Sequence, residues 1–151
     1  MQMERKKKIL VVDDDKSILE SATVILEGEG YSVDTAETGR EAIEKSKEGY
    51  YNLALIDIKL PDMEGTELLT KMELGVPRMR TVMITGYPSL ESTVESLNLG
   101  ADGYLIKPVE PRKLINIIEE KLKEQEVERL KLKLAEQKKQ TKTMLKYYQP
   151  L

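Results

Sequence analysis

Acidic side chains gather at one point near the start of the chain. Asp13, Asp14 and Asp15 follow directly on the apolar run 9–12, which is typical of a buried strand. Acids packed this closely repel one another unless a cation or hydrogen bonds compensate their charge. The cluster predicts a cation site, and a simpler role for one member, Asp15, is to cap the helix that follows.

Three further polar residues occupy equivalent places later in the chain. Asp57, Thr85 and Lys107 each come directly after a short aliphatic run that has the character of a buried strand. In a parallel sheet the carboxyl ends of the strands share one edge, and folds of this kind bind their ligands there. The sequence therefore gathers carboxylates, a hydroxyl and an ammonium around a single crevice.

Phosphoryl transfer to a carboxylate is the chemistry that such a set of groups suits. A carboxylate can act as a nucleophile and form an acyl phosphate. Clustered oxygen ligands favour a hard cation, and we expect Mg²⁺, which could stabilise a transferred phosphoryl group together with a lysine and a hydroxyl. The chain contains no cysteine and no histidine. Thiolate and imidazole chemistry are thereby excluded, as is a role as a phosphohistidine donor.

The apolar pattern predicts an α/β fold with a parallel sheet. Short β-branched runs alternate with helical stripes, and right-handed crossovers favour a doubly wound, flavodoxin-like sheet of order 2-1-3-4-5. Gly30 and Gly100 can end two of the helices. The predicted strands are 8–12, 31–35, 53–56, 81–84 and 103–106, and the predicted helices are 16–29, 38–48, 65–73, 90–99 and an extended one from residue 111.

Charge is distributed unevenly along the 151 residues, whose net charge is −3. Residues 1–120 contain 15 Lys or Arg against 23 Asp or Glu, whereas residues 121–151 contain 9 against 4. An acidic body therefore carries a basic tail. No apolar stretch approaches the length of a membrane span, so we expect no membrane association and a cytoplasmic location.

Four motifs in register resemble the receiver domain of two-component response regulators, the CheY-like family. They are "ILVVDDD", "LALIDIKLPDMEG", "MITGY" and "GYLIKP". The match covers about residues 6–122, which we take as the domain. The resemblance implies a signalling module that takes a phosphoryl group from a histidine kinase or a small phosphodonor and acts on a downstream effector or output domain. It implies no enzymatic activity beyond the domain's own phosphorylation and dephosphorylation.

The resemblance also implies roles for individual residues. Asp57 would be the phosphoacceptor, Lys107 would pair with the phosphoryl group, and Thr85 would hydrogen-bond to it. The implied Mg²⁺ ligands are Asp14, Asp57 and the backbone carbonyl of Lys59, with Asp13 acting through water.

Conformational roles follow from the same likeness. Thr85 and Tyr104 match the switch positions of the family, and Lys107–Pro108 matches its cis peptide bond. Lys59 and Tyr87 lie two residues after Asp57 and Thr85, at positions that flank the path of the attacking water.

Two other interpretations of the acidic crevice remain open at this point. The spacing Asp13-x-Asp15-x-Ser17 resembles the opening motif of haloacid-dehalogenase-type phosphatases, in which Asp13 would be the nucleophile. That alternative leaves Asp57 unexplained, and no acidic pair ends a sixth strand. A receiver-like domain that takes no phosphate is the second alternative, and the presence of Asp57, Thr85 and Lys107 argues against it.

Residues 123–151 are predicted to be a helical basic tail or linker. Val127, Leu130 and Leu134 recur at a spacing of three to four, which allows a short coiled coil of barely two heptads. A homodimer could form through this helix, or through the helix 90–99, the strand 103–106 and the last helix. The tail of one protomer could also pack against the acidic body of another. No DNA-reading motif is present, so we do not expect direct DNA binding.

Overall fold

The parallel sheet predicted from the sequence is present. The structure, a computed structural model, describes residues 5–148 and 150, and within them five parallel strands form one sheet of order β2-β1-β3-β4-β5. The elements are β1 (Lys8–Val12), α1 (Lys16–Gly28), β2 (Ser32–Ala36), α2 (Gly39–Glu48), β3 (Leu53–Asp57), α3 (Gly65–Lys71), β4 (Arg80–Thr85), α4 (Leu90–Asn98), β5 (Gly103–Ile106) and α5 (Pro111–Lys146). Their ends lie within two residues of the predicted ones.

Local signals explain where the helices begin and end. The side chain of Asp15 accepts a hydrogen bond of 2.9 Å from the backbone N–H of Ser17, so the predicted cap of α1 is confirmed. Gly30 and Gly100 both have a φ of 93°, a backbone conformation that side chains disfavour, and each lies just after a helix. The chain therefore reverses direction after α1 and α4 at residues suited to it.

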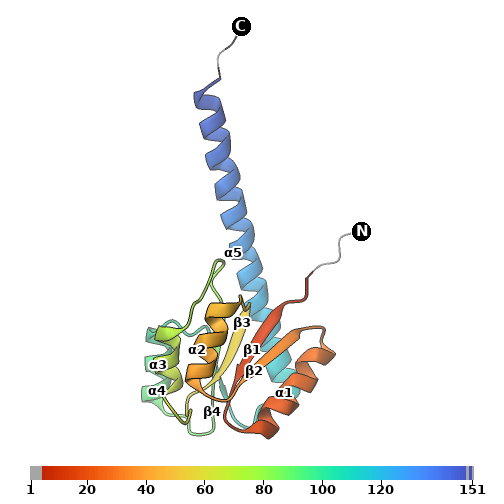
Figure 1. The fold of residues 1–151 in the computed structure, drawn as a ribbon, viewed down its shortest axis with the longest axis vertical. Coiled ribbons are helices and arrows are strands. Elements are labelled where there is room, and N and C mark those ends of the chain that lie inside the picture. Colours follow the sequence, from red (N-terminus) through yellow and green to blue (C-terminus); the bar gives the residue numbers. More distant parts are fainter. Residues whose placement is uncertain (1–4, 149, 151) are drawn as a thin grey trace.

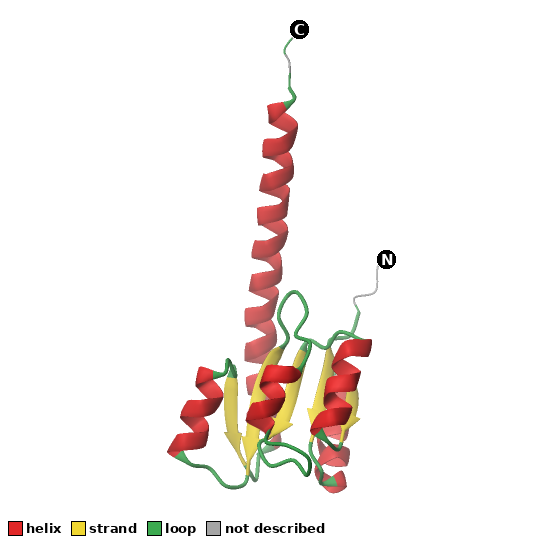
Figure 2. Ribbon diagram, turned by 60° about the vertical axis from the view of Figure 1, so that its left-hand side comes forward, coloured by secondary structure: helices red, strands yellow, loops and turns green. Residues whose placement is uncertain are grey.

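Helices cover both faces of the sheet, as Figure 2 shows. Leucines and isoleucines of α1 and α5, among them Leu26 and Ile118, pack on one face against side chains of β1, β3 and β4. Side chains of α2 and α3, including Ala42 and Leu68, pack with the alternate strand residues on the other face. Because successive strand residues point to opposite faces, the fully buried strands supply both layers of the core.

The last helix extends far beyond the sheet (Figure 1). Its 36 residues span about 54 Å at 1.5 Å per residue. Leu114, Ile118 and Leu122 are buried, and the exposed side chains begin to dominate after Glu128. No helix among residues 5–148 has both the length and the apolar content that crossing a bilayer requires. Residues 149 and 151 of the predicted tail lie outside the described residues.

Contacts between α5 and the body continue past residue 122, the predicted end of the domain. Gln125 is only 2% exposed, and its amide donates to the backbone carbonyls of Asn52 at 2.7 Å and Arg78 at 3.1 Å. It also accepts a bond of 3.0 Å from the Asn52 side chain. One turn later, Glu128 accepts a bond of 2.8 Å from the buried guanidinium of Arg80. These polar contacts fix the direction in which α5 leaves the body.

Replacing Gln125 should therefore destabilise the protein. In Gln125→Leu the side-chain volume is nearly kept, but the Asn52 amide loses its acceptor and the carbonyls of Asn52 and Arg78 each lose one of two donors, at a cost of about 2–3 kcal/mol. Urea unfolding followed by circular dichroism measures this loss. The matched control is Gln140→Leu, an exposed position of the same helix, which should change stability by less than about 0.5 kcal/mol. Equal effects of the two substitutions would contradict the anchoring role.

Candidate functional site

Three carboxylates converge at the carboxyl edge of the sheet. Asp13 and Asp14 follow β1, Asp57 ends the neighbouring strand β3, and one oxygen of each lies within 4.8 Å of the others. Asp13 and Asp57 are buried, whereas Asp14 is exposed. An all-oxygen set of this kind suits a hard divalent cation. The sequence prediction that these acids meet is borne out by the geometry, and the cluster could hold a metal ion.

Lys107 bridges the two buried carboxylates. Its Nζ donates to Asp13 Oδ2 at 2.8 Å and to Asp57 Oδ2 at 3.1 Å. The other oxygen of each carboxylate accepts from the backbone, Asp13 Oδ1 from Asp15 N–H at 2.9 Å and Asp57 Oδ1 from Lys59 N–H at 3.1 Å. Both buried anions are thus paired and hydrogen-bonded, which is the condition for burying charge.

Burial perturbs the titration of this pair. Loss of hydration is the largest influence on Asp57, and together with the nearby Asp13 it raises the pKa of Asp57 in spite of Lys59 and Lys107. Burial alone would lower the pKa of Lys107, but the hydrogen bonds and charges of Asp13 and Asp57 outweigh it and raise that pKa. The site therefore holds a charged lysine next to a carboxylate that is easier to protonate than usual.

The turn after β3 lets a helix approach Asp57 closely. Gly65 begins α3, and a Cβ at this position would clash with the backbone of Asp57 and Ile58. Only glycine fits there, which explains its presence in the "MEG" motif. Lys59 extends from the same turn, and its Nζ forms an ion pair of 3.2 Å with Glu64.

Thr85 ends β4, beside the end of β3. In the register of the two strands Asp57 lies opposite Ile84, so Thr85 is the next residue along the shared edge. Its side chain is 1% exposed, and its Oγ1 accepts a bond of 3.0 Å from the backbone N–H of Tyr87. Within the described residues, Thr85 Oγ1 has this one hydrogen bond, in which it is the acceptor. The side chain of Tyr87 itself is largely exposed.

Tyr104 connects β5 to α4. Its ring packs against the core, and its hydroxyl lies 3.0 Å from Oγ of Ser92. Nothing in the sequence pattern indicated Ser92 as its partner, because the contact joins two elements whose spacing only the fold sets. The Lys107–Pro108 peptide bond is cis, and so is Val76–Pro77, which no sequence motif predicted.

Comparison with known proteins identifies the family. A family model described as "Response regulator receiver domain" matches residues 9–119. This chain belongs to that family. Receiver domains of this kind are parts of two-component signal transduction, and the likeness inferred from the four motifs is confirmed. The comparisons give no support to the haloacid-dehalogenase alternative, in which Asp15 would be a general acid; its side chain instead caps α1.

Curated relatives are considerably longer than this chain. It is 39% identical over 102 residues to the transcriptional regulatory protein ZraR of Escherichia coli K12, covering 68% of this chain and 23% of that protein. It is 33% identical over 108 residues to the cell cycle response regulator CtrA of Brucella ovis, covering 72% of this chain and 47% of that protein. The chain thus spans between about a quarter and about half of these two relatives.

Solved structures share the fold over nearly their whole length. A CheY-like response regulator receiver domain protein from Methanospirillum hungatei JF-1 is 56% identical, with 82% of this chain and 99% of that chain covered and a TM-score of 0.79. The chemotaxis protein CheY4 of Vibrio cholerae is 30% identical, with coverages of 77% and 98% and a TM-score of 0.70.

The raised pKa of Asp57 predicts that this carboxylate costs stability at neutral pH. A folded-state pKa above the unfolded value near 4 destabilises the fold at higher pH, and the penalty disappears as pH falls through the raised pKa. In the absence of divalent cations, Asp57→Asn should therefore be more stable than the wild type by about 1 kcal/mol at neutral pH. The difference should shrink toward about pH 4.

Urea unfolding in EDTA at several pH values measures this difference. Glu20→Gln, which neutralises an exposed acid of α1, serves as the control and should leave the pH profile unchanged. A destabilised Asp57→Asn protein at neutral pH would mean that the Lys107 ion pair outweighs the desolvation of Asp57.

Proposed function

We propose that this receiver domain accepts a phosphoryl group on Asp57, from a histidine kinase or a small phosphodonor, and thereby controls a partner-binding face. The observation that carries the proposal is the meeting of Asp57, Lys107 and two further carboxylates at one edge of the sheet. The edge offers a nucleophile, a fixed cation and an oxygen-rich cluster. Phosphoryl transfer to a carboxylate uses all three.

The transfer forms one bond and breaks another. A carboxylate oxygen of Asp57 attacks phosphorus, and the bond from phosphorus to the donor's nitrogen or oxygen breaks, with its electron pair leaving on the donor. Lys107 already contacts Asp57 and would pair with an oxygen of the new phosphoryl group. The Thr85 hydroxyl would donate to another, since this side chain ends the adjacent strand.

Mg²⁺ fits the donor set, because each side chain of the cluster offers carboxylate oxygen. Asp14, Asp57 and the backbone carbonyl of Lys59 would bind it directly, and Asp13 through water. When bound, the ion would neutralise negative charge on the carboxylates and the phosphoryl oxygens. Lys107 would hold Asp13 and Asp57 in place for it.

A signal could leave the site through Thr85 and Tyr104. Movement of Thr85 toward the phosphoryl group would open space into which Tyr104 rotates, at the expense of its contact with Ser92 in α4. Five of the nine residues of α4 are Ser, Thr, Val or Asn, which have modest helix propensity, so the helix depends on such contacts. The face formed by α4, β5 and α5 would change, and an effector or output domain would recognise the change.

Phosphorylation can be tested directly by intact-mass measurement after incubation with acetyl phosphate. We expect one phosphoryl adduct on the wild type that requires Mg²⁺, and none on Asp57→Asn. Asp62→Asn, which alters an acid of the neighbouring loop, is the control and should keep the adduct. Labelling that persists in Asp57→Asn would place the nucleophile at another carboxylate, and no adduct on the wild type would favour a receiver that takes no phosphate.

Tyr87 is proposed to slow loss of the phosphoryl group. Its backbone N–H donates to Thr85 Oγ1, and its largely exposed ring would shield the mouth of the site. In Tyr87→Ala, water would reach the acyl phosphate more easily, and the phosphoaspartate half-life should fall by about threefold to tenfold, or about 0.6–1.4 kcal/mol in barrier height. Mass spectrometry after removal of the donor gives the half-life. Tyr147→Ala, at the far end of α5, should not change it, and an unaltered half-life in Tyr87→Ala would refute the shielding role.

A further inference from the structure

The part of α5 beyond the body carries a strong positive charge. This α5 extension, residues 129–146, contains seven Lys or Arg and one Glu. Apolar side chains are exposed along it, including Leu130, Leu134, Met144 and Leu145 at 51%, 52%, 75% and 65%. A helix that leaves so much apolar surface in water, flanked by cations, is suited to a partner that is both apolar and acidic.

The apolar and basic residues of the extension occupy adjoining strips. At about 100° per residue, Leu134, Thr141 and Leu145 share one side of the helix. Lys138 and Lys142 lie directly beside this strip, and both lie on the same flank of it. This is the flank toward which side chains rotate around the helix axis as the residue number increases. The outer half of the extension therefore presents Leu134 and Leu145, with the polar Thr141 between them, beside a basic flank.

The exposed side of α4 has the complementary character. Leu90, Val94 and Leu97 are 82%, 46% and 56% exposed, and Glu91 and Glu95 are exposed beside them. The two glutamates lie on the flank of increasing residue number, just as the lysines do on the extension. Leu90, Glu91, Val94 and Glu95 also line a shallow hollow on this surface. We call this set the α4 surface.

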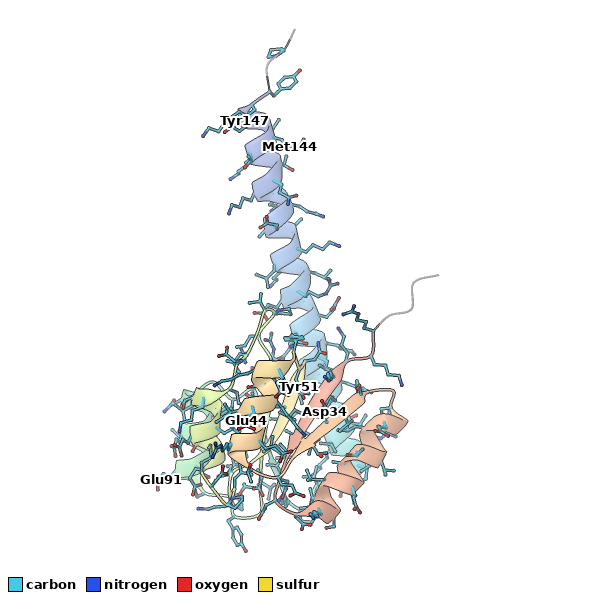
Figure 3. All side chains as sticks on the ribbon, in the orientation of Figure 1. Asp34, Glu44, Tyr51, Glu91, Met144 and Tyr147 are labelled. Carbon is cyan, nitrogen blue, oxygen red and sulfur yellow. The ribbon has the colours of Figure 1, made fainter. Side chains whose placement is uncertain are left out.

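The extension cannot reach the α4 surface of its own chain. α5 is one continuous helix that runs away from the body at the amino edge of the sheet (Figures 1 and 2), and its polar anchor at Gln125 and Glu128 fixes this direction. In Figure 3, Glu91 lies on the body, whereas Met144 and Tyr147 lie near the far end of the extension. A contact between the two surfaces therefore requires a second molecule.

Pairing of two extensions along their apolar strips is less favourable. In a parallel pair with Leu130 and Leu134 at the seam, Lys133 and Lys138 would flank the seam on opposite sides and face each other across it. Gln137 and Thr141 would occupy seam positions. The repulsion between the lysines disfavours this coiled coil, whereas the α4 surface offers the opposite charge. Thr141 is a polar contact residue in either arrangement.

We propose that the α5 extension of one copy packs on the α4 surface of a second copy, and that the exchange is reciprocal. The inference goes beyond phosphotransfer, because it uses neither Asp57 nor a phosphoryl group. Equivalent flanks of two packed helices meet only when the helices run antiparallel. Lys138 and Lys142 therefore meet Glu91 and Glu95 when the extension and the partner's α4 run in opposite directions.

A two-fold axis perpendicular to α5 supplies that orientation. Within one chain α4 and α5 both run opposite to the strands, so they point in the same general direction. The two-fold axis reverses this direction in the partner, so the partner's α4 runs antiparallel to the extension. The extension is about 27 Å long and α4 about 14 Å, so one extension can cover the whole α4 surface. Each dimer contains the contact twice, as an isologous interface requires.

Charge reversal followed by sedimentation velocity tests the proposal on the unphosphorylated full chain. The wild type should form a dimer, and Glu91→Lys/Glu95→Lys or Lys138→Glu/Lys142→Glu should each weaken it by at least about tenfold in Kd. An equimolar mixture of the two variants should dimerise again, since each extension then meets a surface of opposite charge. Glu44→Lys/Glu48→Lys, the same change at the same spacing on α2, is the matched control and should leave the dimer intact.

Several outcomes would overturn the proposal. The first is a wild type that stays monomeric at every concentration up to about 1 mM. The second is a dimer that Glu91→Lys/Glu95→Lys does not weaken, which would indicate a coiled coil. The third is an equimolar mixture of the two variants that fails to dimerise. Circular dichroism checks that each variant folds. Acetyl phosphate labelling of each variant reports the proposed phosphoacceptor separately, so failure of that function and failure of this interface are distinguishable.

Discussion

The ammonium group of Lys107, held between the carboxylates of Asp13 and Asp57, is the interaction on which the functional edge of this protein depends. Two buried anions next to each other are unfavourable by several kcal/mol unless they are paired and hydrogen-bonded. Here one oxygen of each carboxylate binds Lys107 and the other binds a backbone N–H. Asp13 and Lys107 follow β1 and β5, and Asp57 ends β3, so the contact exists only when the sheet from β1 to β5 has formed in register.

The sheet also separates two functions in space. The acidic site lies at the carboxyl edge, whereas α5 leaves the body at the amino edge, where Gln125 and Glu128 anchor it. Arg78 belongs to the same amino-edge group, because its carbonyl accepts from Gln125 and its guanidinium binds Asp102, just after α4, through two bonds of 2.7 and 2.9 Å. Arg78 therefore joins Gln125 of α5 to Asp102, which follows α4, in one polar network. A shift of α4 would change the contacts that anchor α5 to the body.

Sequence patterns were sufficient for the elements and for the residues that lie together at the carboxyl edge. Short continuous aliphatic runs, as in β3, predict buried strands. Asp15, Gly30 and Gly100 begin or end helices through local hydrogen bonds and backbone conformation. Such signals act within a few residues, so they can be recognised in the sequence without knowledge of the fold. The carboxyl edge followed from topology alone, because parallel strands place their ends together.

The long-range polar contacts could not be predicted from the sequence in the same way. Ser92 beside Tyr104, and Gln125 beside Asn52, join residues far apart in the chain, and serine or glutamine on a helix is ordinarily exposed. By itself the sequence determined the doubly wound fold, the acidic edge and the basic tail, because periodicity, residue type and charge are local properties. Only the tertiary structure decided that Lys107 bridges Asp13 and Asp57, and that α5 stays docked as far as Glu128. These contacts depend on distances that packing sets and sequence spacing does not contain.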